Sequence, residues 1–102
     1  KCGGISEALR LAAIAEAAGV GLMVGCGGES RLAITAGTHL AAALKVFQHA
    51  DLDSDLLLAE DLVAEGGSKV ERDMRLLPGG PGLGVRELRE ERLRLVASFG
   101  DR

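Results

Sequence analysis

Apolar residues recur along the first half of the chain in two different patterns. Residues 6–18 carry them at the spacing of one helix face, and the predicted inward side chains are Leu11, Ile14, Ala15 and Ala18. Residues 21–25 form a short apolar run bounded by glycines, which predicts a buried strand. Residues 30–44 predict a second helix, with inward positions Leu32, Ala36, Leu40 and Ala43. Residues 45–50 then predict a second strand.

A short repeat supports this alternation of helices and strands. The sequence Cys2-Gly3-Gly4-Ile5-Ser6 reappears 24 residues later as Cys26-Gly27-Gly28-Glu29-Ser30, and a further step of 24 reaches Ser54. This period suits a strand, a turn, a helix and a return. Ser6 and Ser30 are predicted N-caps, and Gly19 is the predicted stop of the first helix. The chain is therefore predicted to be α/β, with parallel strands joined by helical crossovers.

The second half of the chain follows a different pattern. Residues 55–61 predict a Leu-rich turn of helix or a loop, and residues 62–77 predict a hairpin that turns at Gly66-Gly67. Residues 78–82 are rich in Pro and Gly, which predicts a rigid loop. Residues 86–97 predict a mixed-charge helix whose anchoring positions are Leu88, Leu93 and Val96.

The composition and net charge of the chain exclude some classes of function. Of the 102 residues, 47% are hydrophobic, which excludes a disordered segment, and the net charge of −3 gives no reason to expect nucleic acid or an anionic membrane as a partner. No apolar run is long enough to predict a membrane span. Neither cysteine lies in a CxxC motif, so a reduced, cytoplasmic location is expected. Because the chain starts at Lys1 and not Met, we expect it to begin within a longer protein.

Polar residues follow each predicted strand. The segments 1–6, 26–30 and 51–54 would all lie at the carboxyl end of a parallel sheet, where ligands bind in barrels and open sheets alike. A lysine in such a mouth can act as a base, and two carboxylates can bind an ammonium group. Because side chains alternate along extended backbone, Asp51 and Asp53 should point the same way. The residues predicted around this mouth are Lys1, Glu29, Asp51 and Asp53.

Each of these residues also has an ordinary structural interpretation. Lys1 could be a solvated surface charge, and Asp51 and Asp53 could cap a turn. Glu29 could be an acid favoured by a helix dipole. Cys2 and Cys26 are predicted to be small buried residues and not nucleophiles, because no His follows either cysteine at a sequence spacing typical of a catalytic pair. Two or three parallel strands cannot close a barrel, so the chain is expected to belong to a larger structure.

Four motifs in order resemble the muconate-lactonizing branch of the enolase superfamily. Residues 1–5, Lys-Cys-Gly-Gly-Ile, resemble the segment that carries its second catalytic lysine. Residues 24–30, with Cys26 and Glu29, resemble the seventh-strand segment of its dipeptide epimerases, and Asp51-Leu52-Asp53 resembles their Asp-x-Asp motif. Residues 81–85, Pro-Gly-Leu-Gly-Val, resemble the closing segment. The similarity spans nearly the whole chain.

The resemblance implies a fold and a set of roles. Residues 1–54 would be the last βα units of an enolase-type (β/α)8 (TIM) barrel, incomplete in this chain. Residues 55–102 would be a hairpin and helix extension that packs back on the barrel or on a capping domain. Lys1 would be one of two acid/base lysines in an epimerase or racemase acting on a dipeptide of the Ala-Glu type. Asp51 and Asp53 would hold its ammonium group, and Cys26 and Glu29 are further candidate substrate contacts.

The same resemblance implies what this chain lacks. The other lysine, the three acidic ligands of Mg²⁺ and the capping domain have no counterpart here, so no metal ligand is expected in the chain and it should be inactive alone. Gly27 stands where dipeptide epimerases usually carry Met, and Leu62 where Pro is common. The expected partners are a dipeptide substrate and the remainder of the barrel with its capping domain. Homo-oligomerisation is left open.

Two other functions compete with a dipeptide epimerase. The first is an acylamino acid racemase or o-succinylbenzoate synthase of the same superfamily, although their substrates lack the free ammonium that Asp51 and Asp53 would bind. The second is a non-catalytic α/β fragment that acts by assembly or by binding a partner through its open sheet edges. Sequencing upstream of Lys1 in the intact gene would separate these enzymes from the non-catalytic fragment.

Overall fold

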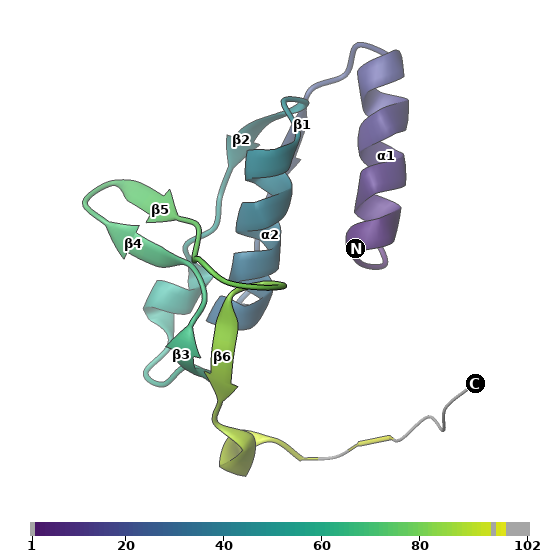
Figure 1. Cartoon of the computed structure of the whole chain (residues 1–102). Helices are drawn as coiled ribbons and strands as arrows, with labels where there is room; N and C mark the ends of the chain where they lie inside the picture. Colours follow the sequence, from purple (N-terminus) through teal and green to yellow (C-terminus); the bar gives the residue numbers. More distant parts are fainter. Residues whose placement is uncertain (1, 95, 98–102) are drawn as a thin grey trace.

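A parallel βαβ unit forms the centre of the molecule. The computed structural model describes residues 2–94, 96 and 97. Strand β1 (Leu22–Val24) leads into helix α2 (Arg31–Ala43), which returns to strand β2 (Phe47–Ala50). The two strands are parallel, with Leu22 opposite Phe47 and Val24 opposite Ala50. The predicted strands, their direction and the α/β class are therefore confirmed. Figure 1 shows this unit with helix α1 (Ile5–Ala17) on one side of α2.

Helix α1 ends as the sequence predicts but buries a different face. Gly19 adopts a φ of 67°, and the amide of Val20 donates to the carbonyl of Ala15 at 2.8 Å, which closes a Schellman motif. The helix begins at Ile5 with Gly4 as its N-cap, so Ser6 lies inside its first turn. Its buried side chains are Ala8, Ala12 and Ala15. The predicted inward residues Leu11 and Ile14 are 48% and 67% exposed, because the alanine face is the one turned to the rest of the chain.

Helix α2 is buried at positions that its hydrophobic pattern does not mark. Its fully or nearly buried residues are Ile34, Thr35 and Thr38, whereas Ala43 is exposed. The Thr38 hydroxyl donates to the carbonyl of Ile34, and that of Thr35 donates to the carbonyl of Arg31, so both hydroxyls keep a hydrogen-bond partner. Of the predicted inward residues, Leu32, Ala36 and Leu40 are half-buried and only Ala43 is exposed. The most buried face differs because the C-terminal segment also covers α2, through the contact between Ser68 and Thr35.

The C-terminal segment forms two short antiparallel pairs. After the 3₁₀ turn η1 (Ser54–Leu57), strand β3 (Val63–Gly66) pairs with β6 (Val85–Leu88), and β4 (Lys69–Glu71) pairs with β5 (Met74–Leu76). The predicted hairpin exists, but it turns at Arg72 and Asp73, while Gly66 ends β3. Residues 78–82 form the predicted loop. In Figure 1 the β4–β5 hairpin and α1 lie on opposite sides of α2.

The predicted helix over residues 86–97 is wrong. Residues 85–88 are strand β6, residues 90–92 are the 3₁₀ turn η2 (Glu90–Arg92), and residues 93, 94, 96 and 97 have no regular structure. Val85 and Leu88 pair with β3, and that non-local pairing overrides the helical spacing of the charged residues. Over the described ranges, no helix has both the length and the apolar character that crossing a membrane requires.

Candidate functional site

Three predicted site residues meet at the carboxyl ends of the two parallel strands. Cys26 follows β1, and Asp51 and Asp53 follow β2. One ligand atom from each lies within 4.8 Å of the others, and the Cys26 thiol donates to Asp53 Oδ1 at 3.6 Å. The amide of Asp51 donates to the carbonyl of Val24 at 2.8 Å, which extends the parallel pairing into the site. Asp51 and Asp53 are exposed, so both carboxylates are accessible to a ligand.

Leu52 lies between the two aspartates in sequence and packs against helix α2. Its side chain turns the opposite way, toward α2, where a Cβ on Gly37 would lie 3.0 Å from Leu52 Cδ2 and 3.3 Å from Val24 Cγ1. Glycine at position 37 is thus what lets the helix approach the strand ends this closely. The alternation predicted for residues 51–53 is confirmed, with the leucine inward and both aspartates at the mouth.

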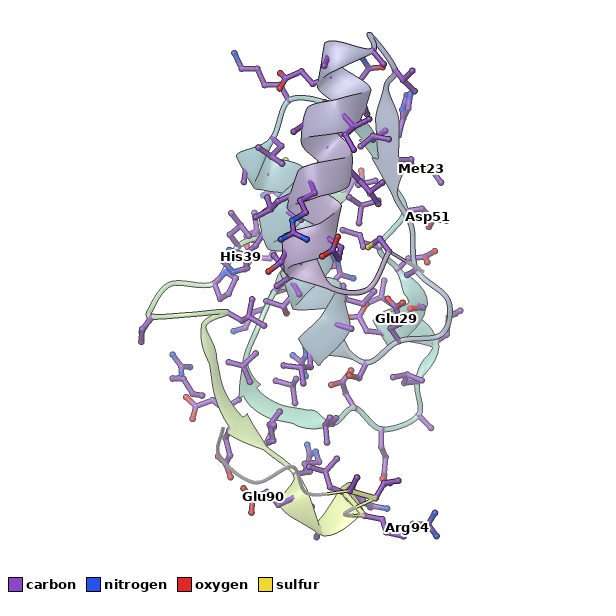
Figure 2. All side chains as sticks on the ribbon, turned by 90° about the vertical axis from the view of Figure 1, so that its right-hand side faces the viewer. Met23, Glu29, His39, Asp51, Glu90 and Arg94 are labelled. Atoms are coloured by element: carbon purple, nitrogen blue, oxygen red, sulfur yellow. The ribbon has the colours of Figure 1, made fainter. Side chains whose placement is uncertain are left out.

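A single buried serine joins the two loops of the site. The amide of Glu29 donates to Ser54 Oγ at 3.0 Å, and the same hydroxyl donates to the carbonyl of Glu29 at 3.3 Å. Ser54 is 6% exposed. The side chain of Glu29 is exposed and does not belong to the cluster of Cys26, Asp51 and Asp53, although Figure 2 shows Glu29 and Asp51 on the same side of the molecule.

Residues of the C-terminal segment brace these loops through hydrogen bonds and an ion pair. Asp61 accepts from the amide of Arg31 at 2.8 Å and from that of Val63 at 2.7 Å, so it caps α2 from 30 residues away. Arg75 binds both carboxylate oxygens of Asp55, at 2.6 and 3.1 Å, just beyond Ser54. Asp51 and Asp53 also line a groove between β2 and the β4–β5 hairpin.

Ser68 links this brace to helix α2. Its amide donates to Thr35 Oγ1 at 2.8 Å, and its hydroxyl accepts from Arg75 at 3.2 Å. Ser68 and Thr35 are both fully buried. None of the bracing residues carries a sequence signal of its own, except that the repeat places Ser54 at the end of its third copy without giving it a role.

The remaining predicted site residues stand as follows. Lys1 lies outside the described residues. Cys26 is half-buried, whereas Cys2 is exposed, so the prediction of a small buried residue is wrong for Cys2. Cys2 is exposed because it precedes the first turn of α1, before any packed element.

The cluster does not suit a magnesium ion. Mg²⁺ requires near-octahedral oxygen ligands, whereas this cluster offers two carboxylates and a thiol. Cys26, Asp51 and Asp53 are therefore not assigned to the metal. Two negative charges beside a polar thiol are instead suited to a cationic group such as an ammonium.

Comparison with protein families identifies the chain. Residues 1–92 match the model of the enolase C-terminal domain-like family. The chain belongs to this family. The resemblance drawn from the four sequence motifs is therefore confirmed.

Two relatives illustrate the similarity. The L-Lys-D/L-Arg epimerase of Methylococcus capsulatus is 47% identical over 85 residues, which cover 83% of this chain and 24% of the relative. The L-Ala-D/L-Glu epimerase of Bacillus subtilis is 44% identical over 85 residues, which cover 83% of this chain and 23% of the relative. The chain thus spans about a quarter of the length of these relatives.

Two solved structures match the fold of this enolase C-terminal domain-like chain. The Methylococcus capsulatus dipeptide epimerase complexed with Mg and the dipeptide L-Arg-D-Lys superimposes with a TM-score of 0.78 at 47% identity, over 83% of this chain and 24% of that one. The N-succinyl Arg/Lys racemase of Bacillus cereus gives a TM-score of 0.76 at 37% identity, over 89% and 24%.

Proposed function

We propose that this chain is the C-terminal part of a dipeptide epimerase, here called the parent enzyme, which is the full-length polypeptide containing residues 1–102. The observation that carries the proposal is that Asp51 and Asp53, after β2, meet Cys26, after β1, at the carboxyl ends of two parallel strands, where barrel enzymes bind substrates. Relatives of this chain named as dipeptide epimerases support it. The reaction would be removal and return of the proton α to the substrate carboxylate.

Each residue of the site has a proposed role. Asp51 and Asp53 bind the α-ammonium of the dipeptide, and Leu52 between them keeps both carboxylates turned to the mouth. Lys1 carries the proton on one face of the substrate. Cys26 and Glu29 are secondary contacts, of which Cys26 is the nearer to the carboxylates. Mg²⁺ is a cofactor of the parent enzyme, with ligands outside this chain, so residues 1–102 alone are inactive.

The open faces of the chain support its place in a larger barrel. Leu11 and Ile14 on α1 and Met23 on β1 are 48–67% exposed, and the parallel sheet has two strands among the described residues. Full burial of such a side chain contributes roughly 1.5–3 kcal/mol, and these three forgo part of that. The proposed partner of these faces is the remainder of the barrel, with residues 1–54 as its last βα units and residues 55–102 as the extension. Cytoplasmic location and homo-oligomerisation stay predictions.

The substrate class is a dipeptide with a free amine. Relatives are named L-Ala-D/L-Glu epimerase and L-Lys-D/L-Arg epimerase, so the Ala-Glu type is proposed as one member of the class. Similarity to an N-succinyl Arg/Lys racemase favours acylated amino acids as a second candidate. The two accessible carboxylates favour the first, because an acylated amine carries no positive charge for them to bind.

Exchange of the α-proton in D₂O, followed by NMR, tests the proposal. The parent enzyme with Mg²⁺ is incubated separately with L-Ala-L-Glu, L-Lys-L-Arg and N-succinyl-L-arginine. Deuterium incorporation into either dipeptide, with formation of its epimer, supports the proposal. Exchange of N-succinyl-L-arginine alone would establish the racemase in its place.

The third candidate is a non-catalytic chain that exchanges the α-proton of none of the three substrates. If the intact gene product is only this chain and none of the three substrates exchanges, a non-catalytic fragment that acts by assembly takes the place of the epimerase. The purified 102-residue chain serves as the matched control. Exchange by that chain alone would contradict the statement that it lacks a complete site.

A further inference from the structure

Ser54 is the one described side chain whose hydroxyl bonds both to and from the backbone of the opposite site loop. It lies directly after Asp53, while Glu29 lies three residues after Cys26. The two bonds, 3.0 and 3.3 Å long, span 25 residues of sequence. They therefore connect the loop that follows β1 to the loop that follows β2.

We infer that Ser54 is a positioning residue that sets the distance between the loop carrying Asp51 and Asp53 and the loop carrying Cys26 and Glu29. This inference rests on the proposed function for its effect on substrate, but its geometric part stands on the contacts alone. Ser54 does not touch the mouth, because it is 6% exposed while both aspartates are exposed. Its effect on a bound ammonium would thus be exerted through Asp53.

The direction of the effect follows from the hydrogen bonds. Without the hydroxyl, the amide and carbonyl of Glu29 lose their partner in a partly buried place. Separation of the two loops then becomes favourable, because it lets water bond to these groups. Separation removes Asp53 Oδ1 from the Cys26 thiol, which now lies 3.6 Å away. The thiol of Cys26 should then become more accessible, and the carboxylates should bind an ammonium less well.

The experiment compares Ser54→Ala with a matched control in the parent enzyme. Thr38→Val is the control, because Thr38 is also 6% exposed and its hydroxyl bonds only within α2, to the carbonyl of Ile34. Alkylation of Cys26 by iodoacetamide is measured in the tryptic peptide of residues 11–31, which contains no other cysteine. Ser54→Ala should raise the alkylation rate roughly fivefold or more, which is the factor that corresponds to the free energy of one hydrogen bond. Thr38→Val should raise the rate less than twofold.

A kinetic measurement separates positioning from general stability. Ser54→Ala should raise KM for the free-amine dipeptide roughly 5- to 10-fold with little change in kcat, because the loop spacing affects ammonium binding and not the proton carrier. Ser54→Thr keeps the hydroxyl and should restore both KM and the alkylation rate. Where Ser54→Ala does not fold, Ser54→Cys replaces it in the KM measurement, since sulfur fills the space with a weaker hydrogen-bonding group.

The outcomes distinguish this inference from the proposed function. A Cys26 alkylation rate in Ser54→Ala equal to that in Thr38→Val overturns the positioning role, whatever the parent enzyme catalyses. Absence of α-proton exchange in the unmodified parent overturns the proposed function, while the alkylation comparison still decides the role of Ser54. Where Ser54→Cys stands in for Ser54→Ala, a KM equal to that of Thr38→Val also overturns the role.

Discussion

Arg75 and Asp55 form a two-point ion pair, with nitrogen–oxygen distances of 2.6 and 3.1 Å, in which the side chains are only 11% and 6% exposed. Asp55 lies two residues after Asp53, and Arg75 belongs to strand β5. This pair thus fastens the β4–β5 hairpin to the loop that carries the candidate ammonium site. A planar guanidinium suits this role because it matches both carboxylate oxygens at once.

Breaking that pair should strongly destabilise the protein. Arg75→Ala leaves the Asp55 carboxylate buried without its partner, so we expect a loss of about 3–5 kcal/mol in the free energy of unfolding, measured by urea denaturation of the parent enzyme. The control is Arg86→Ala, whose partner Glu65 and own side chain are 55% and 63% exposed. An exposed pair should contribute about 0–1 kcal/mol. Equal losses in the two variants would mean that the Arg75 pair does not brace the loop.

Gly37 should be intolerant of larger side chains. The methyl groups of Gly37→Val would press on Leu52 and Val24, which already lie 3.0 and 3.3 Å from the position of a Cβ. We expect a loss of about 1–3 kcal/mol in unfolding free energy, together with a higher KM, because Leu52 sits between the two aspartates. Ala33→Val is the control on an exposed face of α2 and should cost no more than about 0.7 kcal/mol. A Gly37→Val variant with unchanged KM would contradict the coupling.

The parts of the fold that the sequence predicts are those with local signals. Helix α1 ends at Ala17, two residues before Gly19, because glycine readily adopts the φ of 67° that stops the helix there. Strand β1 is an apolar run between glycines, and the 24-residue repeat places both βα turns. The convergence of Asp51, Asp53 and Cys26 follows in turn from the parallel direction of the two strands. Short-range chemistry is enough for these features.

The parts that the sequence does not predict depend on distant partners. Residues 85–88 are a strand only because β3 lies beside them, although their charges suit a helix surface. Thr35 can be buried because its hydroxyl accepts a hydrogen bond from the amide of Ser68, which lies 33 residues later. Ser54 becomes part of the site through a contact with the backbone of Glu29. No hydrophobic period or motif encodes such pairings.

Lys1 should be essential to proton transfer in the parent enzyme. Lys1→Ala removes the proton carrier on one face, so epimerisation should fall by about 10²–10⁴-fold or more, while substrate binding survives through Asp51 and Asp53. Exchange of the opposite epimer's α-proton should persist through the other lysine. The assay is deuterium incorporation from each epimer separately, with Lys45→Ala, an exposed lysine after α2, as the control. Full two-way activity in Lys1→Ala would remove Lys1 from the mechanism.

Asp51 and Asp53 provide the test of substrate class. Each charge-assisted hydrogen bond to an ammonium contributes on the order of 1.5–3 kcal/mol, so Asp51→Asn or Asp53→Asn should lower kcat/KM for a free-amine dipeptide roughly 10- to 150-fold. Glu91→Gln, in the exposed turn η2 and outside the groove that Asp51 and Asp53 line, is the carboxylate control and should leave kcat/KM within about twofold.

The decisive comparison for these two aspartates is between substrates. An N-acylated L-Ala-L-Glu has no α-ammonium and no other cation, so its kcat/KM should change far less in Asp51→Asn and Asp53→Asn than that of the free-amine form. A general folding defect would lower both equally, and thermal denaturation of each variant checks for one. The Cys26 thiol donates to Asp53 and not to Asp51. Asp53→Asn should therefore alter the alkylation rate of Cys26, whereas Asp51→Asn should not. Equal losses for the charged and acylated substrates would exclude ammonium binding and favour the acylamino acid racemase.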